Sequence, residues 1–117
     1  MIEVKGNKLV FSFPEIHRGC RLEVEFQRTL RIPDDGKDYP LPPGLGRFGI
    51  EHTDDHAAKV PQAWVKRGGV MLPMHATEAM WINFRAPPVA GHGAAWPFAV
   101  KIAAGKINAV DGKTWKE

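Results

Sequence analysis

Leu-Glu-Val-Glu-Phe-Gln-Arg-Thr-Leu-Arg-Ile, residues 22–32, is the stretch that decides the fold. Its apolar side chains share one parity and its polar side chains share the other, with Arg28 alone interrupting the apolar set. Because side chains alternate between the two faces of a strand, this pattern predicts one long half-buried strand, or two strands bent near Gln27 and Arg28. We expect the polar face to meet water.

The rest of the chain is divided into short segments by ten Pro and 12 Gly. Proline removes a backbone donor and clashes with the preceding helical turn, which excludes long helices, whereas strands tolerate it at their ends. Turn signals predict a hairpin about Gly6-Asn7 and a C-terminal meander that turns at Ala104-Gly105 and at Asp111-Gly112. The strands expected there are 2–5, 8–13, 98–102, 106–110 and 113–116.

Two further segments carry weaker signals. Pro61 at a first helical position, with Gly68-Gly69 as terminator, predicts one or two helical turns at 61–67. Residues 78–84 fit both a strand and an i, i+4 stripe, and their aromatic and β-branched side chains favour the strand. The sequence therefore predicts one mainly β domain over 1–117, a small sandwich or partly open barrel of about six to eight strands with at most one short helix; α+β is the alternative.

Composition also restricts the function. With 44% hydrophobic and 25% charged residues, a chain of this length can bury roughly 65% of the surface that it exposes when unfolded. Cys20 is the only cysteine, so no internal disulfide can form. No apolar run approaches the roughly 18 residues of a membrane helix, and no secretory signal pattern opens the chain. We therefore expect no membrane partner and a location in the reducing cytoplasm.

The net charge of +3 comes from 16 Lys and Arg against 13 Asp and Glu. The basic residues stand singly or beside acidic ones, and no basic block occurs. A nucleic-acid footprint needs several phosphates neutralised along one face, so nucleic-acid binding is not expected.

Residues 34–46 have the composition of turns and polyproline II, which predicts a rigid loop. Such a loop is either functional or a structural Ω-loop packed by Tyr39, Leu41 and Leu45. Tryptophans supply binding surface at low entropic cost; Trp81 is expected in the core, whereas Trp96 and Trp115 beside Pro97 and lysines are open to either role. The candidate binding residues are Asp34, Asp35, Tyr39, Trp96 and Trp115.

The best metal candidate is the segment His-Thr-Asp-Asp-His at 52–56, because imidazole and carboxylate ligands suit zinc, manganese or iron. The candidate ligands are His52, Asp54, Asp55 and His56, to which His75 and His92 could add. The spacing matches no strong metal motif, and the alternative is a polar surface loop with Asp caps.

Two further groups of residues could support chemistry, and each also has a simpler structural interpretation. His17 lies three residues before Cys20, which could support thiol chemistry, although a lone Cys is more often a buried apolar filler. Asp34 and Asp35 could form an acid and base pair with Glu15 or Glu51, although Asp-Asp-Gly is more simply a turn.

Three strings, RTLRIPDDGKDYPLPPGLGRF (28–48), GGVMLPMHATEAMWINF (68–84) and PFAVKIAAGKINAVDGKTW (97–115), resemble a family of uncharacterised bacterial proteins. The resemblance covers about half of the chain and implies no catalytic residue or cofactor. It implies that longer members continue beyond the position of Trp115, so this chain could be a short form or an amino-terminal domain. Where the family has an aromatic residue and Gln, this chain has His75-Ala76, which argues against catalysis by His75.

Together these observations predict a non-catalytic binding or interaction module. A sheet edge or the 34–46 loop would engage another protein or a second copy of the chain. The alternative is a small metal-dependent enzyme centred on residues 52–56, with a divalent metal as its cofactor; otherwise no cofactor is expected.

Overall fold

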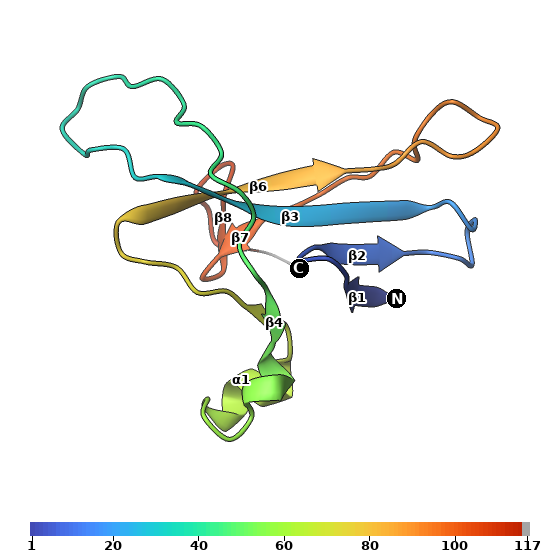
Figure 1. Cartoon of the computed structure of the whole chain (residues 1–117), viewed down its shortest axis with the longest axis horizontal. Coiled ribbons are helices and arrows are strands. Elements are labelled where there is room, and N and C mark those ends of the chain that lie inside the picture. Colours follow the sequence, from blue (N-terminus) through green and yellow to red (C-terminus); the bar gives the residue numbers. More distant parts are fainter. Residues whose placement is uncertain (116–117) are drawn as a thin grey trace.

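A four-stranded antiparallel sheet forms the centre of the protein in the computed structural model, which describes residues 1–115. Its strand order is β1-β2-β3-β6, so β1 and β6 are the edge strands (Figure 1). The strands are β1 (Ile2–Val4), β2 (Leu9–Ser12), β3 (Arg21–Leu30) and β6 (Glu78–Arg85).

Strand β3 is the predicted long strand, and it runs unbroken. Over residues 23–30, one edge of β3 pairs with the whole of β6. The other edge pairs first with β2 and then with residues 45–48, where the Phe48 N–H donates to the Phe26 carbonyl at 2.8 Å and the Arg28 N–H donates to Gly46 at 2.8 Å. Because both edges are paired, β3 is the central strand.

The predicted hairpin at the N-terminus is confirmed. β1 and β2 pair in antiparallel register, and Gly6 and Asn7 between them have φ values of 58° and 59°. Two consecutive positive φ values define the type I′ turn, whose twist matches that of the flanking strands. Only Gly and Asn adopt this conformation at low cost, which explains why the sequence signal was reliable here.

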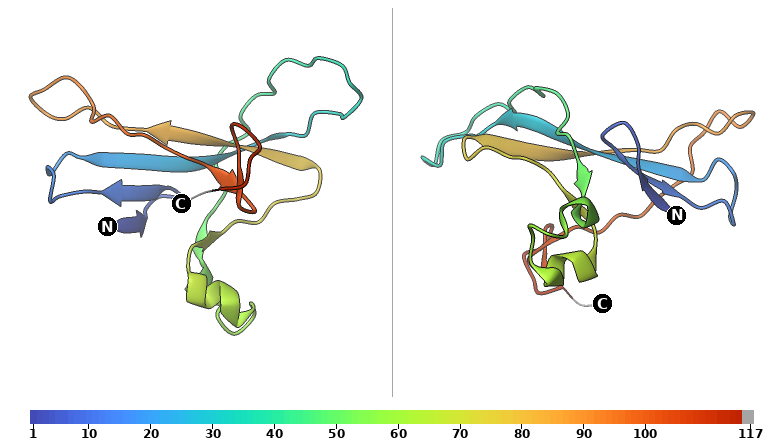
Figure 2. Two further views of the ribbon diagram at one scale, coloured as in Figure 1. Left: turned by 180° about the vertical axis from the view of Figure 1, so that it is seen from behind. Right: turned by 60° about the horizontal axis from the view of Figure 1, so that its bottom comes forward.

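Two small two-stranded sheets complete the structure. Strand β4 (Glu51–His52) pairs with β5 (Val70–Met71), and β7 (Ala103–Ala104) pairs with β8 (Ile107–Asn108). Between β4 and β5 lie a 3-10 turn, η1 (Thr53–His56), and the helix α1 (Gln62–Arg67). Figure 2 shows that α1 and the β7–β8 ribbon lie on the same side of the large sheet.

The mainly β fold with at most one short helix is confirmed, and the sheets do not close into a barrel. The strand predicted at 78–84 is β6, and the helical turns predicted at 61–67 are α1. Gly68, with φ of 70°, ends α1 by donating its N–H to the carbonyls of Trp64 and Val65. Within residues 1–115 no helix has the length and apolar character needed to cross a membrane.

The C-terminal meander is shorter than predicted. Residues 98–102 form no strand, because their alternating pattern supplies an apolar face but no strand within residues 1–115 pairs with them. The turn lies at Gly105-Lys106 rather than Ala104-Gly105. Of the strand predicted at 113–116, Thr114 makes a single bridge to Ile107, and Lys116 lies outside the described residues.

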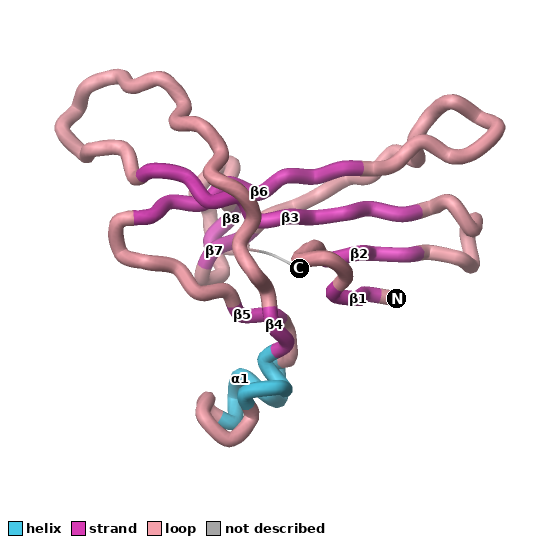
Figure 3. Tube along the Cα trace, in the orientation of Figure 1, coloured by secondary structure: helices cyan, strands magenta, loops and turns pink. Residues whose placement is uncertain are grey.

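The core is small. Among the described residues, Phe48 is the one large side chain that is fully buried, and the other buried apolar residues are Val10, Cys20, Val24, Ile50 and Val89. Long segments without secondary structure run between the sheets (Figure 3).

The overall dimensions agree with a small core. The chain exposes 9155 Å², whereas a compact monomer of its mass exposes about 6,300 Å². Its radius of gyration is 16.8 Å, against about 13 Å for a compact domain of this length. The isolated chain therefore buries less surface than the sequence led us to expect.

Candidate functional site

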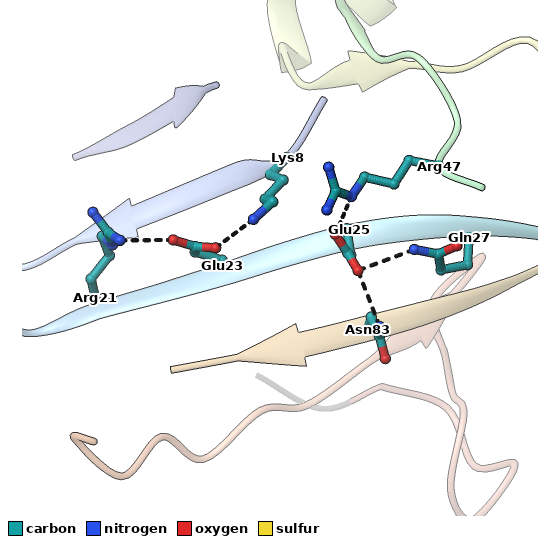
Figure 4. A network of polar contacts seen from close by, with 7 residues as sticks. All are labelled: Lys8, Arg21, Glu23, Glu25, Gln27, Arg47 and Asn83. Carbon is teal, nitrogen blue, oxygen red and sulfur yellow. Dashed lines mark hydrogen bonds and ion pairs between the residues drawn. The ribbon is translucent and has the colours of Figure 1, made fainter. Parts of the chain in front are cut away.

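The polar face of the large sheet carries a network of charged side chains (Figure 4). Glu23 accepts hydrogen bonds from Lys8 and Arg21, both at 2.8 Å. Glu25 accepts from the amides of Asn83 and Gln27, both at 3.1 Å, and from Arg47. The register between β3 and β6 explains the contact between Glu25 and Asn83, because it places these two residues directly opposite each other.

This face does not meet water as freely as the alternation of β3 suggested. The side chains of Glu23 and Glu25 are only 13% and 18% exposed, because their long basic and amide partners lie over them. The Lys8 hydrogen bond lowers the pKa of Glu23, and the Asn83 hydrogen bond is the largest of those that lower the pKa of Glu25. Both carboxylates are therefore already satisfied within the chain, which makes them structural groups.

The Pro-rich segment 34–46 is the predicted loop, and it projects beyond one end of the sheet (Figure 1). Within it, Asp35 accepts the Lys37 N–H at 3.1 Å and the Tyr39 hydroxyl at 2.7 Å. The Tyr39 hydrogen bond lowers the pKa of Asp35, and the same bond raises the pKa of Tyr39. Asp34 is exposed and lies outside this arrangement.

The base of this loop is fixed to the sheet. The buried Thr29 hydroxyl donates to the Pro43 carbonyl at 3.0 Å. A Cβ added to Gly44 would lie 3.1 Å from Trp81 Cζ2, so the backbone at Gly44 passes directly over the half-buried indole of Trp81. The loop thus has a rigid base, and its Asp35–Tyr39 tip is exposed.

The two tryptophans predicted for binding lie elsewhere. The Trp96 ring lies 5.8 Å from the His17 ring, whereas Trp115 lies under Lys101, with Nζ 4.9 Å from the ring centroid. Of the five candidate binding residues, the structure therefore brings only Asp35 and Tyr39 together.

The metal candidates at 52–56 occupy the end of β4 and the η1 turn. His56 Nε2 contacts the Glu51 carboxylate rather than another candidate ligand. His75 Nδ1 is hydrogen-bonded to the Thr77 hydroxyl at 2.8 Å, and the His92 ring lies 6.4 Å from the His17 ring. Across residues 1–115, no three His, Cys, Asp or Glu side chains are grouped in a way that could hold a metal ion.

The thiol arrangement also lacks the geometry for catalysis. Cys20 is buried, and the ring nitrogen Nδ1 of His17 accepts the Gly19 N–H at 2.9 Å. The carboxylate Asp35, weighed as half of an acid and base pair, is engaged by Tyr39. Cys20 is thus shielded from solvent, whereas Asp35 is exposed but hydrogen-bonded within its own loop.

Two features could not be located from the sequence. One is the outer edge of β6, which no strand within residues 1–115 covers: the sequence predicted that a sheet edge would serve as an interaction surface but did not indicate which strand, because that depends on the order of strands in the sheet. The other is a pair of cavities around His17 and Trp96, which come from parts of the chain that are far apart in sequence. Local patterns report neither the order of strands nor the contacts between distant loops.

Comparison of the chain with protein-family models, with curated proteins and with solved structures finds no match, so its function has to be argued from its own residues.

Proposed function

We propose that this chain is a non-catalytic interaction module, and that its partner is a second copy of itself. The observation that carries the proposal is the exposed surface of the single chain, which exceeds that of a compact monomer by about 2,800 Å². Obligate homodimers bury about 2,000–5,000 Å² in total. That is about 1,000–2,500 Å² per chain, so association of two copies covers much of the surplus of each chain.

The outer edge of β6 is the surface best suited to this association. Since the backbone groups of Phe26 and Arg28 face residues 45–48, those of Glu25 and Gln27 face β6. Backbone groups alternate in direction along an antiparallel strand. The partners of Glu25 and Gln27 on β6 are Asn83 and Trp81, so their backbone groups form hydrogen bonds with β3. The backbone N–H and C=O groups of the alternate residues, Met80, Ile82 and Phe84, therefore face outward.

No strand within residues 1–115 covers that edge. A long, uncovered edge strand with apolar side chains is a template for pairing with another chain. Met80 and Phe84 are 37% and 42% exposed, and they lie on the same face as Ile82. The other edge strand, β1, has only three residues.

A two-fold axis through Ile82 gives a self-complementary register. Ile82 would face Ile82 of the second copy, and Met80 would face Phe84 of the second copy. Each of these pairs exchanges two backbone hydrogen bonds, because both members point their backbone groups toward the partner. The same pairing brings the exposed Met80 and Phe84 side chains into contact across the axis.

The remaining chemistry of the chain is compatible with this role in the cytoplasm. Cys20, the only cysteine, is buried and gives the protein no means of linking copies covalently. The acidic groups of the β3 face are paired within the chain. Association through β6 therefore depends on backbone pairing and apolar contact.

Sedimentation equilibrium over a concentration series tests the proposal. The wild type is expected to be a dimer, and Met80→Lys/Phe84→Lys is expected to raise the dissociation constant at least about a hundredfold, since like charges facing each other cost several kcal/mol. The matched control, Leu41→Lys/Val110→Lys, adds the same charge at two exposed apolar sites in loops and should remain dimeric.

Two results would contradict the proposal. A wild type that is monomeric at every concentration would exclude self-association and leave a different protein as the partner. A dimer that both double variants preserve equally would place the interface away from β6.

A further inference from the structure

Two neighbouring cavities open at the end of the large sheet, where the β2–β3 connection meets residues 86–97. Their volumes are about 350 and 320 Å³, and they share His17 and Val89 as lining residues. Cavities of this size that are apolar and hold a few polar groups are typical of small-molecule sites. The proposed self-association through the outer edge of β6 involves none of the residues that line these cavities.

The first cavity is apolar and bordered by rings. Trp96 lies 5.8 Å from His17 with a tilt of 36°, and His92 meets the edge of His17 at 6.4 Å. Ala94, Ala95 and Pro97 form the rest of its wall. The small alanine side chains leave room that a flat ring can fill, and aromatic rings favour offset or tilted contacts with another ring.

His17 lines both cavities, and its contact with Gly19 fixes which ring nitrogen is the hydrogen-bond donor. Its Nδ1 accepts the Gly19 N–H at 2.9 Å, so the neutral ring carries its proton on Nε2. Gly19 can approach this closely because it has no side chain: an added Cβ would lie 3.1 Å from Val89 Cγ1 and 3.3 Å from His17 Nδ1. The imidazole therefore offers a donor rather than an acceptor at its free nitrogen.

The second cavity is cationic. Arg18 and Arg21 line it beside Pro87 and Pro88, and no carboxylate lines either cavity among the described residues. Arg21 is paired with Glu23 at 2.8 Å, whereas Arg18 makes no ion pair within residues 1–115. An unpaired guanidinium beside an apolar chamber favours an anionic group over a cation or a neutral group.

From these contacts we infer that the pair of cavities binds a small aromatic carboxylate. The ring occupies the chamber beside Trp96, and the carboxylate lies toward Arg18 and the Nε2 donor of His17. Apolar burial of the ring supplies affinity, and the charged hydrogen bonds supply selectivity for the anion.

The probe for this site is 2-naphthoate, with 2-naphthamide as a neutral compound of the same shape. Titrations of the full chain are followed by amide NMR, with the Trp96 indole N–H as reporter, and by calorimetry. We expect naphthoate to shift the Trp96 and Gly19 resonances and to bind at least tenfold more tightly than the amide. Arg18→Gln should abolish that preference, and Ala95→Trp should fill the chamber and prevent binding of both compounds.

The matched control is Arg67→Gln, which removes the same charge from an exposed site at the end of α1. It should leave naphthoate binding unchanged. Equal binding of the acid and the amide, an equal effect of Arg18→Gln and Arg67→Gln, or no shift at Trp96 up to millimolar naphthoate would each overturn the inference. Because these readouts do not depend on the dimer, they are independent of the proposed self-association.

Discussion

The guanidinium carbon of Arg28 lies 4.7 Å from the centroid of the Phe48 ring, and Arg28 Nε donates to the Glu78 carboxylate at 2.8 Å. Arg28 is the one residue that interrupts the apolar parity of β3. Its position explains the interruption, because the guanidinium lies over the ring of the fully buried Phe48 and also pairs with Glu78. Arg28 is therefore a partly exposed residue that covers one side of the core.

Replacing Arg28 tests that function. Arg28→Ala should lower the free energy of unfolding by about 1–2 kcal/mol, since it removes both the cation–π contact and the apolar stem. Arg28→Met keeps most of the stem and should lose less. Urea unfolding at one fixed protein concentration measures both variants, and equal losses would show that the stem contributes nothing.

Acid stability should depend on Glu23 and Glu25. Their pKa values are lowered in the folded state, so their contribution to stability is complete above the unfolded value, 4.5, and is lost as the pH falls through the folded values. The free energy of unfolding should therefore decline from about pH 4.5 downward. Urea unfolding at several pH values measures the decline.

A double variant separates the contribution of Glu23 and Glu25 to acid stability from that of the other carboxylates. Glu23→Gln/Glu25→Gln cannot titrate at these positions, so it should be less stable than the wild type at neutral pH but should lose less stability on acidification. Parallel acid profiles for the wild type and the variant would contradict the assignment.

The single tyrosine reports on the Pro-rich loop. Ionising Tyr39 would break its hydrogen bond to Asp35 and place two negative charges together, which is why its pKa is raised. Asp35→Asn should move the phenol midpoint to lower pH in an ultraviolet titration, which is unambiguous because the chain has one tyrosine. Asp34→Asn, one residue away, should shift it less; equal shifts would mean that the observed bond does not persist in solution.

The close approach of Gly19 to Val89 predicts a coupling between them. Gly19→Ala should cost about 1–3 kcal/mol, because its Cβ would lie 3.1 Å from Val89 Cγ1 in a packed site. In a Val89→Ala background the same change should cost much less, since the opposing methyl groups are gone. Thermal or urea unfolding of the wild type, the two single variants and the double variant measures this coupling. If Gly19→Ala lowers the free energy of unfolding equally in both backgrounds, the contact with Val89 relaxes freely.

Sequence patterns predicted local structure well wherever a local cause was sufficient. The alternation of 22–32, the Gly6-Asn7 turn and the Gly68 helix end each act through neighbouring residues, and each was found in the structure. Residues 98–102 show the limit of this reasoning. Their alternation is as regular as that of a strand, but a strand also needs a neighbour, and none of the described strands pairs with them.

The candidate site was harder to predict for the same reason. Asp35 and Tyr39 lie four residues apart in a turn, so their association was within reach of the sequence. His17 and Trp96 come from opposite ends of the chain and meet because β3 and β6 are neighbours. The uncovered edge of β6 among the described residues likewise follows from the strand order, which depends on pairings between residues 48 to 62 positions apart in the sequence.

Isotope-filtered NOE spectroscopy on an equal mixture of labelled and unlabelled chains tests the pairing of two β6 edges most directly. Intermolecular contacts are expected between the backbone protons of Ile82 and those of Ile82 in the second copy, and between the backbone protons of Met80 and those of Phe84 in the second copy. A dimer with intermolecular contacts from other elements and none from β6 would contradict this pairing.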